Sequence, residues 1–200
     1  MSPRPRKVTD DDVFAAAHRA MTRLGPGELT LARIAQEAGV TAGALAQRFG
    51  SKRDLLLALA RRAADGTGDF IRGLRAEHGS PLATVRAYAA CMAHLARSPA
   101  ALARNLAYLQ IDLADPDFRT HLTAQAGATR AAIADLLADA VADGELAPAT
   151  DLATLARTVE ITLNGALLTW AFDQREPADV FIRAAVDAVL APHLLPSTDR

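Results

Sequence analysis

The stretch Thr30–Leu57, TLARIAQEAGVTAGALAQRFGSKRDLLL, predicts two short helices joined by a tight turn. From Leu31 onward, apolar residues recur at i, i+3, i+4 and i+7, the spacing that places side chains on one face of a helix. Thr30 is a suitable N-cap for this helix. Gly39 follows its last apolar residue, where a residue without Cβ most easily adopts the left-handed backbone that ends a helix.

A second helix is predicted directly after the turn. Thr41 is a suitable N-cap, and Leu45 and Phe49, four residues apart, form the buried face. Two helices joined in this way form a helix-turn-helix, whose second helix enters the major groove of DNA. The residues that this pattern leaves facing outward are Ala42, Gly43, Ala44, Ala46, Gln47 and Arg48.

A further helix is predicted to start after Gly50. Ser51 and Asp54 have the spacing of a capping box, and Lys52 and Arg53 occupy the first turn. Cations in a first turn oppose the helix dipole, so their placement indicates an external anion such as a phosphate. Lys52 is therefore a candidate DNA contact.

The residues before this stretch complete a three-helix unit. Thr9 and Asp12 form another capping box and open a helix with one apolar face. We therefore predict a DNA-binding domain over residues 1–54, with a basic arm at 1–8 and the motif at 31–50. Residues 55–200 are assigned to a second domain.

The pattern T-x-x-x-I-A-x-x-A-G-V-T-x-G-x-L, followed by R-F-G-S-K-x-x-L, resembles the tetracycline-repressor (TetR) family of bacterial transcriptional regulators. The resemblance covers residues 9 to about 60. It implies an all-α homodimer of about nine helices per chain, with an N-terminal helix-turn-helix domain. The C-terminal domain would bind a small effector and supply the dimer interface. The implied function is a repressor that an effector releases from a palindromic operator.

One position departs from the family pattern. Members usually carry an aromatic residue, most often Tyr, where Ala46 stands, and that tyrosine commonly touches the DNA backbone. One positioning contact is thus absent, and Thr30, Thr41, Lys52 and the arm are the remaining candidates. The alternative is a helical partner-binding adaptor with a degenerate motif, which would not show salt-dependent binding to random duplex DNA.

Composition and charge agree with a cytoplasmic DNA-binding protein. Residues 1–53 carry nine Lys or Arg and five Asp or Glu, a net charge of +4, so the remainder carries −5. Arg4, Arg6 and Lys7 form the basic arm, which is either a DNA contact or a solvated tail. No secretory signal or membrane-spanning run is present, and the single Cys91 fits a reducing compartment.

The rest of the chain reads as amphipathic helices separated by Gly and Pro. In the helix predicted over Lys52–Arg75, Gly66 and Gly68 indicate a kink, a fraying end or a close contact. We predict that effector binding shifts this helix at these glycines. The other helices are predicted over Pro81–Arg97, Pro99–Leu113, from Pro116 to a stop at Gly144, Val159–Phe172 and Pro177–Leu190.

The last two predicted helices indicate a homodimer. Val159–Phe172 contains Glu160 as its only charge, so this helix must be buried on more than one side. The two helices would meet their symmetry mates in a four-helix interface, with Gly165 and Ala166 where backbones approach. The alternative is a large monomer core.

An effector site is predicted among the apolar helices, and no catalytic, metal or cofactor site is. Cys91 and His94 lie three residues apart, but no third group orients them. The candidate acids Asp112, Asp115 and Asp117 lack the spacing of a calcium loop, and Asp115 already serves as an N-cap. The effector is expected to be apolar or neutral, because buried charge is scarce. Its candidate contacts, each of which is alternatively a core residue, are Tyr88, Met92, Tyr108 and Asn164.

Overall fold

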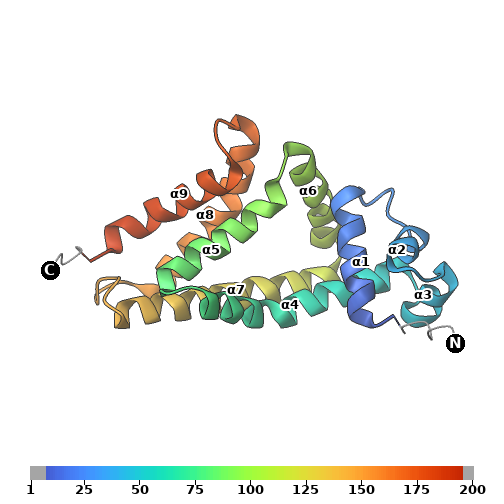
Figure 1. The fold of residues 1–200 in the computed structure, drawn as a ribbon, viewed down its shortest axis with the longest axis horizontal. Helices are drawn as coiled ribbons and strands as arrows, with labels where there is room; N and C mark the ends of the chain where they lie inside the picture. Colours follow the sequence, from blue (N-terminus) through green and yellow to red (C-terminus); the bar gives the residue numbers. More distant parts are fainter. Residues whose placement is uncertain (1–7, 196–200) are drawn as a thin grey trace, which may run out of the picture. The chain divides into compact units, whose positions relative to one another are not determined.

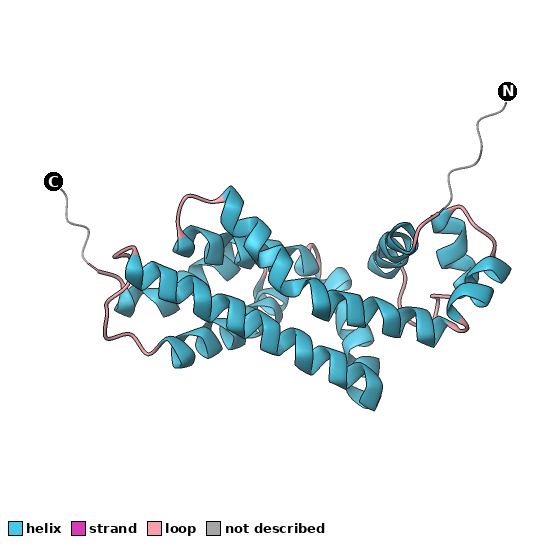
Figure 2. Cartoon of the chain, turned by 90° about the horizontal axis from the view of Figure 1, so that it is seen from below, coloured by secondary structure: helices cyan, strands magenta, loops and turns pink. Residues whose placement is uncertain are grey.

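The computed structural model describes residues 8–195, and all its regular elements are helices (Figures 1 and 2). The predicted all-α class is confirmed over this part of the chain. Short 3₁₀ turns follow α5 at His94–Ala96 and α9 at Ala191–His193. The helices are α1 (Asp10–Arg23), α2 (Leu31–Ala38), α3 (Ala42–Phe49), α4 (Lys52–Glu77), α5 (Pro81–Ala93), α6 (Pro99–Ala114), α7 (Pro116–Ala142), α8 (Leu152–Asp173) and α9 (Ala178–Leu190).

Side-chain caps set the starts of these helices. The capping box of Thr9 and Asp12 opens α1, with the Thr9 amide donating to Asp12 Oδ2 at 2.9 Å. In front of α4, Ser51 and Asp54 exchange the same pair of bonds, at 3.2 Å and 3.1 Å. The hydrogen bond from the Ser51 side chain lowers the pKa of Asp54 and so favours its charged form. Both predicted capping boxes are thus confirmed.

The chain divides into two units that do not follow chain order. The N-terminal unit runs to Arg62 and also includes Ala103–His121, which form most of α6 and the first turns of α7. The C-terminal unit consists of Ala63–Leu102 and the chain from Leu122 onward. Part of α6 and α7 therefore belongs with the three N-terminal helices.

The core of the N-terminal unit joins α1, α2 and α3 to α4 and α6. Tyr108 of α6 is buried in it, and its hydroxyl donates to the Leu24 carbonyl at 2.9 Å. Burial raises the pKa of Tyr108 to about 12, and the nearby charge of Glu28 acts in the same direction. Other buried members are Val13, Ala17, Ala20, Leu29, Ile34, Ala35, Leu45 and Leu55.

In the C-terminal unit, α9 packs on α5 and α8 (Figure 1). Buried side chains of these helices and of α7 form one apolar cluster, which includes Ile133, Leu163 and Ile182. Arg86 of α5 donates to Asp187 of α9 at 2.6 Å. Within the described residues, no helix has the length and apolar character needed to cross a membrane.

Two expectations about backbone features need correction. Helix α4 runs without interruption through Gly66 and Gly68, and a Cβ built at Gly66 would meet nothing within 4 Å. The helix therefore has no break at these glycines, but a Cβ built at Gly68 would lie 3.3 Å from Arg72 Nη1, which agrees with the predicted close contact at that position. Ala166 is 6% exposed inside the core of its own chain, whereas Gly165 faces open space. Only Gly165 remains available to a symmetry mate.

Candidate DNA-binding surface

The turn between α2 and α3 has the geometry that the sequence predicts. Gly39 adopts φ +70°, a left-handed conformation that glycine reaches without a steric penalty. The Val40 amide then donates to the Ala35 carbonyl at 3.0 Å and closes the turn. Thr41 caps α3 by accepting a hydrogen bond from the Ala44 amide at 3.1 Å. Thr30 caps α2 in the same way.

One side of α3 is buried, and the other is exposed to solvent. Leu45 is 1% exposed in the N-terminal core, and Phe49 contacts the Phe14 ring with centroids 5.8 Å apart. Most residues on the opposite side are small, so another molecule can approach the α3 backbone closely. All six outward residues of the sequence pattern are exposed, namely Ala42, Gly43, Ala44, Ala46, Gln47 and Arg48.

Arg48 has partners at the start of α1 and just before it that the sequence did not reveal. Its Nη1 atom donates to the Val8 carbonyl at 2.9 Å, and its Nη2 atom forms an ion pair with Asp10. The guanidinium carbon lies 5.5 Å from the centroid of the Phe49 ring. The side chain is therefore directed to the start of α1.

Lys52 also has internal partners. Its Nζ atom donates to the carbonyls of Pro26 and Leu29 at 3.2 Å and 2.9 Å, in the loop between α1 and α2. Because these carbonyls already satisfy two of its donors, Lys52 does not require an external anion at the start of α4. A phosphate contact by Lys52 stays a prediction.

The neighbouring Arg53 binds two carboxylates at the start of α7. It donates to Asp115 at 2.8 Å and 2.9 Å and to Asp117 at 2.7 Å, and its guanidinium carbon lies 5.7 Å from the Phe118 ring centroid. The pKa of Asp115 is lowered overall. Burial acts to raise it, but the hydrogen bonds from Arg53 and from backbone amides together outweigh that effect. This contact joins α4 to α7 within the N-terminal unit.

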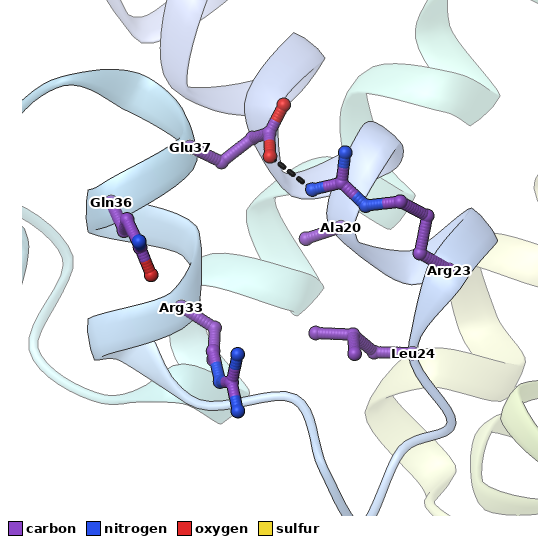
Figure 3. Close-up of a pocket in the computed structure, with 6 residues that line it drawn as sticks. All are labelled: Ala20, Arg23, Leu24, Arg33, Gln36 and Glu37. Carbon is purple, nitrogen blue, oxygen red and sulfur yellow. Dashed lines mark hydrogen bonds and ion pairs between the residues drawn. The ribbon is translucent and has the colours of Figure 1, made fainter.

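A groove of about 470 Å³ lies between α1 and α2 (Figure 3). At one end, Glu37 binds Arg23 and accepts a hydrogen bond from Arg19 at 2.9 Å; the hydrogen bonds from Arg19 and Arg23 lower the pKa of Glu37. Arg33 lies at the other end. The lining residues are Ala20, Arg23, Leu24, Arg33, Gln36 and Glu37.

Arg33 is a candidate that the sequence reasoning missed. Its side chain is exposed, and it has no hydrogen-bond or ion-pair partner among residues 8–195. It occupies the first turn of α2, so the criterion that selected Lys52 would also have selected Arg33. The cations of the predicted arm, Arg4, Arg6 and Lys7, lie outside the described residues.

Two family models match this chain. Residues 13–59 match the bacterial regulatory proteins of the tetR family, and residues 82–185 match the tetracyclin repressor-like C-terminal domain. The chain belongs to the TetR family. It is accordingly a DNA-binding transcriptional regulator, and this membership favours DNA binding over the adaptor alternative.

Solved structures share the TetR fold at low identity. A TetR transcription regulator from Haloarcula marismortui is 18% identical, with 93% of this chain and 98% of that chain covered and a TM-score of 0.73. SmeT, the repressor of the Stenotrophomonas maltophilia efflux pump SmeDEF, is 20% identical, with coverages of 97% and 94% and a TM-score of 0.66.

A third similar structure is that of FadR from Bacillus subtilis in complex with stearoyl-CoA. It is 17% identical, with coverages of 92% and 98% and a TM-score of 0.66. At these identities the likeness to solved structures establishes the fold alone. The comparison with curated proteins gives no match.

The four candidate effector contacts of this TetR-family chain do not form one cluster. Tyr88 and Met92, on α5, pack against the C-terminal core. The pKa of Tyr88 is raised overall, because the effect of burial outweighs the opposite effect of a hydrogen bond with Thr129. Tyr108 belongs to the N-terminal unit, and Asn164 is exposed on α8. The structure therefore brings only Tyr88 and Met92 together.

Proposed function

We propose that this TetR-family regulator is a repressor that binds a palindromic operator as a homodimer and leaves it when a small effector binds. The observation that carries the proposal is the exposed side of α3, which combines small residues with one long amide, Gln47. Gln is suited to bidentate hydrogen bonding with adenine, and alanine side chains contact thymine methyl groups. Base reading is accordingly assigned to Gln47 and to Ala42, Ala44 and Ala46.

Phosphate contacts are assigned to the residues at the edges of α3. Thr30 and Thr41 cap helices whose first-turn amides carry partial positive charge, which favours binding of a phosphate. Arg33 adds a full charge that no described carboxylate neutralises. Lys52 remains in this group as the weakest member, since it already binds two carbonyls.

The homodimer is assigned to an apolar stripe on α8, extended by α9. Ile161, Leu168 and Phe172 are 60%, 41% and 86% exposed, and they follow one face of α8 together with Gly165. Val180 on α9 is 37% exposed. Removing apolar surface from water contributes about 25 cal/mol of free energy per Å². A second copy that covers this stripe therefore stabilises a dimer. Two copies of α3 would then reach successive major grooves about 34 Å apart.

The effector is assigned to the C-terminal unit, next to Tyr88 and Met92. Both residues lie beside the apolar core, and the hydroxyl of the partly buried Tyr88 supplies a polar group that can orient a ligand. The B. subtilis FadR structure contains stearoyl-CoA, whose acyl chain is apolar. An apolar or neutral effector fits the same chemistry in this chain.

Coupling between effector and DNA is assigned to α4, α6 and α7. All three helices contribute residues to each unit, so they connect the two through the chain. Within the N-terminal unit, α7 binds Arg53 of α4, and α6 binds the end of α1 through Arg104, whose Nε atom donates to the Thr22 carbonyl at 3.2 Å. A shift of α6 or α7 would therefore displace the DNA-binding helices.

Selection of bound duplexes from a random pool tests this proposal. The expected result is a palindrome with half-sites about one helical turn apart, bound with an affinity that falls steeply with salt. A single unrepeated half-site would contradict the homodimer, and no enrichment at all would contradict sequence-specific binding.

A further inference from the structure

The contacts of Arg48 connect the recognition helix to the root of the basic arm. The Val8 carbonyl, which accepts from Arg48 Nη1 at 2.9 Å, belongs to the first described residue, forty positions away in sequence. Asp10 binds the same guanidinium. Arg48 thus holds the backbone on the arm side of Thr9, while the capping box holds the backbone on the helix side.

The same contacts make Arg48 poorly suited to reading a base. Its charge is paired with a carboxylate, and two of its nitrogen atoms are engaged with Asp10 and Val8. A bidentate contact to guanine needs two neighbouring donors of the guanidinium in one plane, and the ion pair with Asp10 competes with such a contact. With 37% of the side chain exposed, water weakens the ion pair, but the three contacts together still fix the guanidinium in one place.

We propose that Arg48 is a positioning residue that holds the root of the basic arm beside α3, so that the arm and the recognition helix act on the same DNA segment. This inference rests on the proposed function. Seven residues precede Val8, and they include Arg4, Arg6 and Lys7.

Arg62 provides a matched control. It also pairs with an acid at the start of α1, Asp11, at 2.7 Å, and its guanidinium carbon lies 5.6 Å from the Phe14 ring centroid. The two arginines therefore resemble each other in ion pairing and ring contact. Of the two arginines, only Arg48 donates a hydrogen bond to the residue at the arm root.

A double-mutant cycle on DNA binding tests the proposal. The variants are Arg48→Met, Arg62→Met and deletion of residues 2–7, alone and combined, with methionine keeping the aliphatic length over the ring. In the wild type and in Arg62→Met, arm deletion is expected to weaken binding to random duplex by the same factor. In Arg48→Met that factor should shrink about threefold to tenfold, the range typical of coupled residues. Equal factors in all three backgrounds would overturn the proposal.

A second measurement needs no DNA. Trypsin cleavage after Lys7 requires the backbone around Val8 to leave its partners, so the rate of appearance of the product beginning at Val8 reports on the root. Arg48→Met is expected to accelerate this cleavage several-fold, whereas Arg62→Met leaves it unchanged. Unchanged cleavage in Arg48→Met would contradict the anchor. Failure of the wild type to bind any duplex, with accelerated cleavage in Arg48→Met, would contradict the proposed function and leave the anchor standing.

Discussion

The exposed faces of α3 and α8 differ in the size and hydrophobicity of their side chains. On α3 the outward residues are mostly alanine and glycine, with Gln47 and Arg48 at the end. On α8 the outward residues include Ile161, Leu168 and Phe172, each more than 40% exposed. Both faces lie on helices whose other side is buried in a core.

The difference indicates two kinds of partner. Burying a large apolar side chain contributes about 1.5–3 kcal/mol, so the α8 face gains most from a dry protein surface. The α3 face offers little apolar area, and its short side chains instead let the backbone approach a charged, grooved surface. Four tests of this contrast follow, from the largest expected effect to the smallest.

Placing a charge on the α8 face should have the largest effect. In Leu168→Glu, both copies would bury a carboxylate at the proposed interface, so we expect the dimer to dissociate at least about a thousandfold more readily. Sedimentation velocity at micromolar concentration measures this. Ala131→Glu, which adds the same group at an exposed position of α7, should leave the dimer intact. A stable Leu168→Glu dimer would remove α8 from the interface.

The two sides of α3 should respond differently to truncation. Leu45 is 1% exposed, so Leu45→Ala is expected to lower the free energy of unfolding by about 2–5 kcal/mol. Gln47→Ala, on the bare side, should change it by less than about 0.5 kcal/mol and alter the preference among DNA sites. Urea unfolding and duplex selection measure the two effects. A large loss of stability in Gln47→Ala would show that the Gln47 side of α3 packs against the rest of the protein.

Arg33 and Lys52 should separate DNA binding from stability. Arg33→Ala is expected to reduce the slope of log affinity against log salt by about 0.9, with no change in unfolding free energy. Lys52→Met removes two charge-assisted hydrogen bonds, so we expect a loss of about 1–3 kcal/mol of stability and a smaller change in slope. If Lys52→Met flattens the salt dependence more than Arg33→Ala does, Lys52 is the phosphate contact.

Acid should have the smallest effect. The pKa of Asp54 is lowered in the folded protein, so its contribution to stability is present above the ordinary carboxyl pKa and is lost as the pH falls through the folded value. The same direction applies to Glu37. Unfolding measured from pH 6 to pH 3 should be less pH-dependent in Asp54→Asn than in the wild type. Identical profiles would show that the capping carboxylate contributes nothing.

Features that depend on neighbouring residues could be predicted from the sequence. The bounds of α2 and α3, the turn at Gly39 and both capping boxes follow from residues within about four positions of each other. Helix ends were less certain where local signals compete. The 3₁₀ turn His94–Ala96 replaces the last turn predicted for α5, and α8 begins at Leu152, where Asp151 accepts from the Thr154 amide.

Functional surfaces were predictable only in part. The exposure of the α3 residues follows from helical periodicity, but the partners of Arg48 and Lys52 lie 40 and up to 26 positions away. Tyr108 shows the same limit, because an apolar helix face does not reveal which unit will bury it. Its contact with Leu24 spans 84 positions.

The sequence by itself determined the TetR family, the helices and the residues that face outward on the recognition helix, because periodicity and capping act over one or two turns. The tertiary structure alone decided which cations are free. It paired Arg48 with Asp10 and Arg53 with Asp115, and left Arg33 exposed without a described partner. A charge can be read from one residue, but its availability depends on which distant carbonyl or carboxylate the fold brings beside it.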